Sequence, residues 1–464
     1  MKQLSRIFLV LVCTALVHSS LYAQNGGIDA AALARISQQG ATSTQADRAL
    51  RNALAATSIN QLATTADNPT APNTYFSNEA PSRGITDQKS SGRCWLFSGL
   101  NVLRAEMIRN YKLGDFRFSQ AYLFFFDQLE KSNLFLQTIL DTAPLPDDDR
   151  LVDLLFDHPI GDGGTFCGVQ SLVSKYGVVP SEVFPESFAA NNTSKMSQII
   201  SLKLREFGLE LRRMSAEKKK PAVLQKRKEE QLAEIYHILS ICLGTPPTSF
   251  TYTLRDNSGK ALSTDTYTPM SFYQKFIHKD LANGYVMMMN DPSRPYYKMY
   301  SVKLDRHVYD APDWTFLNLP MDDIKKVAIR SLQDSTRLYM SCDVGKYYDS
   351  KTGTCDLKNF DYESLFATTF PMSKAERIKT HASASSHAMT FCGVDLDANG
   401  KPLKWKVENS WGPTSGSQGH LIMTDEWLDE YLFRLVAERK YVGDDLLRLT
   451  NQKPIELPAW DPLF

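Results

Sequence analysis

Residues 88–98 constrain what this chain can fold into more than any other segment. Cys94 directly precedes an apolar run with helical spacing, whose members are Leu96, Phe97, Leu100, Leu103 and Met107. The run predicts a helix with the Cys94 sulfur at its N-terminus, where the helix dipole and free backbone N–H groups favour a thiolate. Gln88 lies upstream, and its side-chain amide can join the Cys94 backbone N–H in binding an oxyanion. A nucleophile is therefore predicted, although a cysteine at a helix start is more often a small buried hydrophobic residue.

A predicted β-hairpin near the C-terminus supplies two further polar side chains. Two apolar runs between residues 388 and 408 flank Asn399-Gly400, a pair that is typical of hairpin turns. His387 precedes the first run and Asn409 follows the second. A near-symmetric hairpin places the two side chains on neighbouring strands, where cross-strand side chains meet. The imidazole can then serve a thiol nucleophile while the asparagine amide orients the ring.

Composition excludes several classes of protein. Lys plus Arg and Asp plus Glu are equal at 52 each, so no net field holds nucleic acid or an anionic membrane surface. We therefore expect no nucleic acid partner. The seven cysteines include no C-x-x-C pair and the eight histidines no H-x-x-x-H pair, so we expect neither a metal nor another cofactor.

The first residues predict a secretory signal. Lys2 and Arg6 precede an apolar run over residues 7–17, and residues 21–23 end with a small residue before Gln24. The alternative is a buried N-terminal helix. The run has about eleven residues, which is too short to span a bilayer. We expect an exported protein, periplasmic or extracellular, with no stable membrane insertion after the signal is removed.

Several separate motifs together resemble the bleomycin hydrolase and aminopeptidase C family of the papain superfamily. These motifs are residues 88–98, Asp162-Gly163-Gly164, residues 175–180, residues 342–346, Ser386-His387-Ala388-Met389, Glu408-Asn409-Ser410-Trp411-Gly412 and Thr424-Asp425-Glu426-Trp427. The resemblance covers residues 45–464 and implies an α+β fold with two papain-like lobes, one helical and one like a β-barrel. It also implies a large, mainly helical insert, which accounts for the long separation between the cysteine and the histidine.

Sequence pattern and resemblance together divide the chain into six segments. These are a signal peptide (1–23), an N-terminal leader (24–80), a helical lobe with the nucleophile (81–194), the family insert (195–340), a β lobe with the histidine and asparagine (341–450) and a C-terminal arm in the cleft (451–464). Apolar residues in the leader predict two short helices, one from residue 28 and one over 50–62. Pro221 predicts a break in the charged helical region over 195–243.

The resemblance implies a cysteine peptidase that acts on peptides as an aminopeptidase. It gives Cys94 the role of nucleophile, His387 that of general base and then acid, Asn409 that of orienting the imidazole and Gln88 that of oxyanion donor. The expected substrate-binding residues are Gly163 and Gly164, which let a substrate backbone approach, Trp411, which covers the His–Asn hydrogen bond, and Phe464 in the arm. The family also implies a homohexameric ring whose active sites face a central chamber.

Alternatives remain open at this point. The tail matches the family's Pro-x-Trp-Asp-Pro pattern and then stops a few residues before the usual end, which withdraws the terminal carboxylate by about 10 Å. An endopeptidase or a di- or tripeptidyl peptidase is therefore one alternative. A catalytically silent peptide-binding ring is another, and an acyl or aminoacyl transferase that uses the same thioester is a third. The sequence leaves open whether Cys342 and Cys355 form a disulfide.

Overall fold

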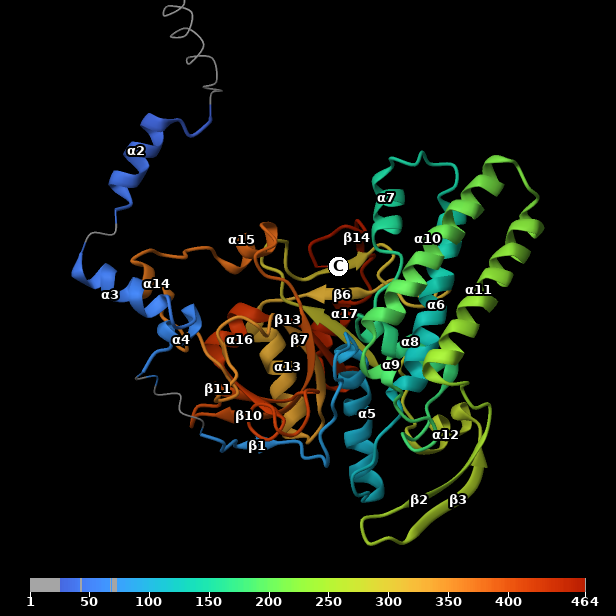
Figure 1. Cartoon of the computed structure of the whole chain (residues 1–464). Helices are drawn as coiled ribbons and strands as arrows, with labels where there is room; N and C mark the ends of the chain where they lie inside the picture. Colours follow the sequence, from blue (N-terminus) through green and yellow to red (C-terminus); the bar gives the residue numbers. More distant parts are fainter. Residues whose placement is uncertain (1–25, 42–43, 67, 69–72, 464) are drawn as a thin grey trace, which may run out of the picture. The chain divides into compact units, whose positions relative to one another are not determined.

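The computed structural model describes residues 26–41, 44–66, 68 and 73–463 (Figure 1). The predicted signal peptide, residues 1–23, and Phe464 lie outside the described residues. The described residues up to Thr64 form one compact unit with Ser364–Phe366, and Thr65–Glu363 and the residues from Ala367 onward form the other. The larger unit contains the lobes and the predicted site.

Three short helices form the smaller unit, where the sequence predicts two. They are α2 (Ala30–Gln39), α3 (Gln45–Leu54) and α4 (Ile59–Ala63). The predicted second helix is divided because the Ser58 side chain accepts a hydrogen bond from the Gln61 backbone N–H and so begins a new helix. The expected count of two leader helices is therefore wrong, and side-chain capping is the reason.

Helices dominate the larger unit from Cys94 to Phe276. They are α5 (Cys94–Tyr111), α6 (Gln120–Asp141), α7 (Arg150–Asp157), α8 (Phe166–Tyr176), α9 (Phe188–Asn191), α10 (Ser194–Ala216), α11 (Pro221–Leu243) and α12 (Pro269–Phe276). A separate hairpin consists of β2 (Phe250–Arg255) and β3 (Ala261–Tyr267). The predicted break is confirmed, because α11 begins at Pro221, and proline suits a first helical position that needs no N–H donor.

One hydrophobic core joins the predicted helical lobe to the first part of the insert. Buried residues from five helices meet in it, among them Leu100, Leu123, Val169, Ile200 and Ile235. The α10–α11 pair packs on α6, so the insert completes the lobe. Within the described part of the chain, no helix combines the length and apolar character needed to cross a membrane.

A twelve-stranded sheet forms most of the second lobe. Its strands are β1 (Asn78–Glu79), β4 (Tyr285–Met289), β5 (Lys298–Val302), β6 (Thr315–Asn318), β7 (Leu338–Cys342), β8 (Tyr348–Asp349), β9 (Thr354–Cys355), β10 (His387–Leu396), β11 (Pro402–Glu408), β12 (His420–Thr424), β13 (Leu432–Glu438) and β14 (Ile455–Leu457). They follow the order β14-β5-β6-β4-β13-β7-β10-β11-β12-β9-β8, with β1 beside β10. The sequence places strands β4–β6 in the insert, but they belong to this sheet. They join it because β4 pairs with β13, which is distant in the chain, and β6 pairs with β4.

Five α-helices and one short 3-10 helix accompany the strands after β6. They are α13 (Met321–Gln333), α14 (Tyr362–Phe366), α15 (Lys374–Lys379), α16 (Asp425–Tyr431), α17 (Asp444–Leu449) and η1 (Arg439–Tyr441). Helices α13 and α16 share a second core with the inner face of the sheet, to which Val327, Met340, Phe391, Trp405 and Trp427 contribute. Cys342 and Cys355 are both buried in this core as free thiols.

The hairpin predicted around Asn399-Gly400 is confirmed. Strands β10 and β11 pair antiparallel, and Gly400 adopts a φ of +80° in the turn, where glycine meets no Cβ penalty. The last paired residues at the open end are Thr390 and Glu408, after an irregularity between Phe391 and Gly393. His387 therefore lies three residues beyond the last pair and Asn409 one residue beyond it, so the two are diagonal rather than directly opposite.

A buried ion triad joins the helical lobe to the sheet. Glu408 of β11 binds the guanidinium of Arg104 in α5 at 2.6 Å and, on its other oxygen, that of Arg337. Burial alone raises the pKa of Glu408, but Arg337 and Arg104 lower it below its ordinary value. Because α5 also packs directly on β10, the helix that starts at Cys94 is fixed against the strand that starts at His387 (Figure 1).

Candidate active site

The Cys94 thiol lies at the start of α5, as the sequence predicts. No side chain caps this helix N-terminus, because the N-cap residue is Arg93, whose guanidinium is buried and paired with Glu186 at 2.9 Å. Burial raises the pKa of the Cys94 thiol, while the backbone N–H groups of Ala388 and Trp95 act in the opposite direction. The Ala388 N–H thus binds the sulfur, and Ala388 directly follows His387, the predicted base.

His387 and Asn409 are brought together. His387 Nε2 lies 2.8 Å from Asn409 Oδ1, and the same oxygen accepts a hydrogen bond from the backbone N–H of Ser410 at 2.8 Å. Because an amide oxygen only accepts, Nε2 must carry the proton, which leaves Nδ1 of the neutral ring free to take one. Trp411 packs on the imidazole with ring centroids 4.7 Å apart. The structure therefore holds the ring in the tautomer that a general base needs.

Gln88 is linked to this pair through Ser410, a residue with no role predicted from the sequence. The Ser410 hydroxyl donates to Gln88 Oε1 at 2.6 Å, and the Gln88 backbone N–H donates to the Ser410 carbonyl at 2.8 Å. Gln88 Nε2 donates to the Ser91 carbonyl at 2.6 Å, which leaves its second amide hydrogen available. The position of Ser410 directly after Asn409 was the signal that could have identified it.

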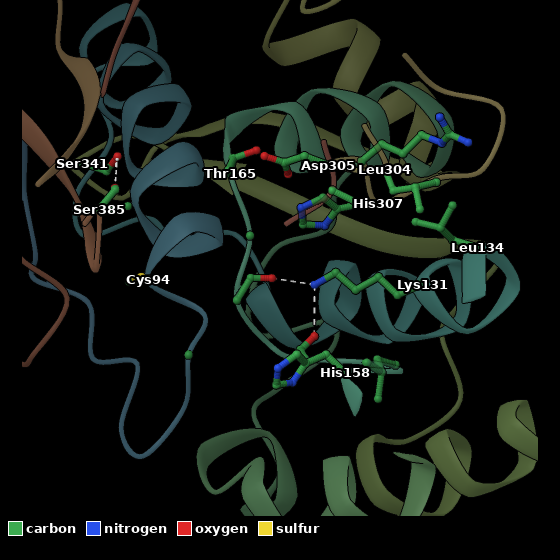
Figure 2. Close-up of a pocket in the computed structure, with 18 of the residues that line it drawn as sticks. Cys94, Lys131, Leu134, His158, Thr165, Leu304, Asp305, His307, Ser341 and Ser385 are labelled. Atoms are coloured by element: carbon green, nitrogen blue, oxygen red, sulfur yellow. Dashed lines mark hydrogen bonds between the residues drawn. The ribbon is translucent and has the colours of Figure 1, made fainter. Parts of the chain in front are cut away.

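One cavity of about 610 Å³ lies at this site, and Figure 2 shows part of it. Cys94, Gln88 and His387 line it, together with Gly163 and Gly164. Trp411 does not line this cavity but covers the imidazole from behind, and Phe464 is outside the described residues. The structure thus brings together all four predicted catalytic residues and two of the predicted substrate-binding residues.

The two glycines differ in what surrounds them. A Cβ at Gly163 would meet no atom within 4 Å, which leaves room for a substrate backbone. A Cβ at Gly164 would lie 2.2 Å from Cε1 of His307, so this glycine is required by packing inside the protein. His307 is itself held by Asp127, whose Oδ1 lies 2.5 Å from Nδ1. Lys131 completes the support by donating to the Gly163 carbonyl at 2.6 Å (Figure 2).

Asp162 fixes the loop that precedes the nucleophile. Its carboxylate accepts a hydrogen bond from the Gly92 backbone N–H at 2.6 Å, and its carbonyl accepts one from the Trp95 indole at 2.9 Å. A Cβ at Gly92 would lie 2.3 Å from this carboxylate. The Asp-Gly-Gly segment thus positions the residues on both sides of Cys94.

The C-terminal arm reaches the same cavity. Ala459 lines it, and Asp461 forms an ion pair with Arg294. Arg434 donates a hydrogen bond to the Leu463 carbonyl at 2.5 Å, and Leu463 is buried. These contacts hold the arm at one wall of the cavity as far as residue 463.

Acid should destabilise the protein through His387. Burial lowers the pKa of this imidazole from 6.5 to about 4, so between these values the unfolded chain binds a proton that the folded chain does not. The stability from neutral His387 is therefore complete above pH 6.5 and is lost as the pH falls toward 4. From pH 7 to pH 5 we expect a loss of about 2 kcal/mol from this group. Urea unfolding at both values should show a larger loss for the wild type than for His387→Gln, and equal losses would contradict this.

Replacing Asn409 by alanine should slow catalysis without removing it. The variant leaves the His387 ring without its 2.8 Å partner, so the base is misoriented for part of the time. We expect kcat to fall by about 10- to 100-fold with little change in KM. Steady-state kinetics on one peptide measure this, with Asn283→Ala, an exposed asparagine outside the cavity, as the matched control. A change in KM alone would show that Asn409 acts on substrate binding.

The cleft brings together a thiol at a helix start, an imidazole oriented by an asparagine, and a glutamine amide. Together with the two lobes, this arrangement defines a papain-like cysteine peptidase. The model of the Peptidase C1-like family matches residues 28–464, and the chain belongs to this family.

Relatives specify the family further. The chain is 39% identical over 400 residues to bleomycin hydrolase of Homo sapiens, which covers 84% of this chain and 88% of the human protein. It is 38% identical to aminopeptidase C of Streptococcus thermophilus, with 84% and 87% covered. The crystal structure of PepW from Lactobacillus rhamnosis HN001 superposes with a TM-score of 0.91 at 36% identity, and covers 95% of this chain and 99% of that one. The chain is therefore a cysteine-type aminopeptidase of the bleomycin hydrolase and aminopeptidase C type, and the expected fold and family are confirmed.

Proposed function

We propose that this enzyme hydrolyses peptides from their amino termini through a thioester on Cys94. The observation that supports this most is the Gln88–Ser410–Asn409–His387 chain of hydrogen bonds at the wall of the cavity that Cys94 lines. It connects an oxyanion donor to an oriented base through Ser410 and Asn409, an arrangement that serves acyl transfer.

The first half of the reaction forms the acyl-enzyme. His387 Nδ1 takes the Cys94 proton, and the sulfur attacks the carbonyl carbon of the scissile peptide bond. Burial raises the pKa of the Cys94 thiol and lowers the pKa of the His387 imidazole, so the resting pair is neutral and the proton passes to the imidazole as the sulfur attacks. The free amide hydrogen of Gln88 and the Cys94 backbone N–H bind the oxyanion. His387 then protonates the departing amine, and the C–N bond breaks.

The second half releases the product. His387 removes a proton from water, whose oxygen attacks the thioester carbonyl, and the C–S bond breaks to return the thiol. The amide of Asn409 holds the ring through both halves, since the same nitrogen serves as base and then as acid. An amine in place of water would make the enzyme a transferase, and the choice depends on access to the cleft.

Mass spectrometry of products from one decapeptide in free and N-acetylated forms tests this proposal. The mature enzyme is incubated in reductant, with the Cys94→Ala variant as control. Stepwise loss of residues from the free peptide alone supports the aminopeptidase. Internal cuts in both peptides would show an endopeptidase, and loss of di- or tripeptides would show the corresponding exopeptidase. Absence of cleavage would favour a silent peptide-binding protein.

We further propose that the protein is exported and that it assembles as a homohexamer. Export is supported by the charged start, short apolar run and small residue of positions 1–23, and the hexamer by the family resemblance. Mass analysis of the amino terminus after fractionation of the source cells tests the first, since export predicts a chain that begins at Gln24 outside the cytoplasm. Light scattering of the purified protein tests the second, because it distinguishes six copies from one.

A further inference from the structure

Lys131 of α6 lies beside the glycine loop, residues 161–164, in the wall of the active-site cavity. Its Nζ donates to the Gly161 carbonyl at 3.1 Å and to the Gly163 carbonyl at 2.6 Å (Figure 2). It also pairs with Asp127 at 2.9 Å, and its side chain is only 13% exposed. An ammonium group has three N–H donors, so these three acceptors use all of them. Lys131 is thus held in one position, with its charge directed at the protein.

Asp127 of α6 supplies the counter-charge. Its side chain is fully buried, and its second oxygen lies 2.5 Å from Nδ1 of His307, in the loop between β5 and β6. Burial alone raises the pKa of Asp127, but Lys131 and His307 lower it below its ordinary value, so the carboxylate is ionised. Burial and Lys131 lower the pKa of His307, so this ring is neutral at pH 7. The three side chains therefore carry one positive and one negative charge.

His307 joins this group to the nucleophile helix. Its ring centroid lies 4.5 Å from that of Trp95, the residue that follows Cys94. A Cβ at Gly164 would lie 2.2 Å from the His307 ring, and a Cβ at Gly168 of α8 would lie 2.4 Å from it. Lys131 Nζ lies 5.4 Å from the centre of the same indole. The group thus contacts both the glycine loop and the first turn of α5.

The Gly163 carbonyl depends on Lys131 more than the Gly161 carbonyl does. Gln128 also donates to Gly161 at 3.1 Å, whereas Lys131 is the one side chain among the described residues that donates to Gly163. A peptide group is planar, so holding the Gly163 carbonyl also sets the direction of the Gly164 N–H. Both glycines line the cavity. The lysine therefore controls the backbone surface that a substrate meets beside the thiol.

We propose that Lys131 is a positioning residue for peptide hydrolysis, which holds the glycine loop in the orientation that guides the peptide past Cys94. This inference rests on the proposed function, because it concerns the path of a peptide substrate. Within the described part of the chain, the polar contacts of Lys131 reach the loop and Asp127 and none of the four catalytic residues. Its loss should therefore affect a substrate that lies along the loop, but not a small reagent that meets only the sulfur.

Two reactions of the same thiol test this inference in Lys131→Met, which keeps an unbranched apolar side chain without donors. We expect kcat/KM for a peptide to fall by about 10- to 100-fold, because a displaced loop misplaces the substrate. The rate of Cys94 alkylation by iodoacetamide, followed by mass spectrometry of the peptide that contains Cys94, should stay at the wild-type value. A loss of stability alone would not separate these two rates.

Lys203→Met is the matched control. Lys203 of α10 also pairs with a carboxylate, that of Glu206 at 3.0 Å, and lies 4.5 Å from the centre of an aromatic ring, that of Phe207. It does not line the cavity, so this variant should retain both rates. Equal losses of cleavage and alkylation in Lys131→Met, or no loss of either, would overturn the inference.

The double variant Lys131→Met with Asp127→Asn separates positioning from charge balance. The single variant leaves a buried carboxylate without its cation, whereas the asparagine removes that charge and its amide oxygen can still accept from His307. We expect the double variant to fold, as circular dichroism verifies, and still to cut peptides slowly, because Gly163 lacks its donor. It replaces the single variant if that one does not fold. Recovery of the wild-type kcat/KM would show that Lys131 only balances charge, and would overturn the inference.

Failure of the proposed function gives a different result. A wild type that is alkylated at Cys94 but cuts no peptide would refute peptide hydrolysis itself, before any variant is compared. A loss confined to peptide cleavage by the Lys131 variants would support the inference.

Discussion

Cys94→Ala should abolish peptide hydrolysis. The variant removes the sulfur that forms the acyl-enzyme, and removing the nucleophile of such a unit costs at least about 10⁴-fold in kcat. The fold should be unaffected, because alanine is a good helix former at the start of α5 and the site keeps its Gln88–Ser410 hydrogen bond. Hydrolysis rates over long incubations, with circular dichroism of both proteins, measure the two effects.

A second cysteine provides the control for this substitution. Cys242 is a half-buried thiol in α11, outside the cavity, so Cys242→Ala should retain full activity. Treatment of the wild type with a thiol-alkylating reagent should inactivate it, with the added mass on the peptide that contains Cys94. Activity of Cys94→Ala within tenfold of the wild type would exclude the thioester mechanism.

Glu408→Ala should destabilise the fold by about 3–5 kcal/mol. Its side chain is 1% exposed and pairs with two guanidinium groups, Arg104 at 1% and Arg337 at 4% exposure. Removing the carboxylate takes away the ion-pair partner of Arg337 and leaves Arg104 with only the more distant Asp115 at 4.0 Å, which costs far more than the ion pairs contribute when complete. Because Glu408 directly precedes Asn409, the same change should also lower kcat. Urea unfolding followed by circular dichroism gives the change in free energy.

Glu430→Ala is the matched control for that measurement. Glu430 also pairs with an arginine, Arg377, but its side chain is 40% exposed, and pairs at the surface contribute at most about 1 kcal/mol. A Glu408→Ala loss no larger than that of Glu430→Ala would contradict the argument from burial. Glu408→Gln should fall between the two, since it keeps part of the hydrogen bonding without the charge.

Local sequence pattern predicted the pieces of this site well. The helix that starts at Cys94, the hairpin around Asn399-Gly400 and the break at Pro221 each follow from interactions among residues close in the chain, namely apolar periodicity, turn conformation and the missing proline N–H. Such signals involve only a few neighbouring residues, so they can be detected without knowledge of the fold. The same holds for the four predicted catalytic residues, Gln88, Cys94, His387 and Asn409, whose types and order are visible in the sequence.

Other features depended on residues that are distant in the chain. The hairpin symmetry predicted His387 directly across from Asn409, but the pairs Leu396–Pro402 and Thr390–Glu408 centre the hairpin on residue 399 instead of 398. The side chains therefore meet diagonally. Strands β4–β6 of the predicted insert join the sheet because β4 pairs with β13, β6 with β4 and β5 with β6. Register and non-local strand pairing are determined by packing between distant segments. No single segment contains the information that fixes them.

The residue types of the proposed reaction, a cysteine at a helix start, a histidine, an asparagine and a glutamine, are all present in the amino-acid sequence in recognisable patterns. How these groups are held depends on the folded structure. Ser410 connects Gln88 to Asn409, the Glu408 triad fixes α5 on the sheet, and Asp127 binds His307 beside the glycine loop. These contacts mostly join residues that are tens to hundreds of positions apart in the chain. They form only when the two lobes bury their shared surface.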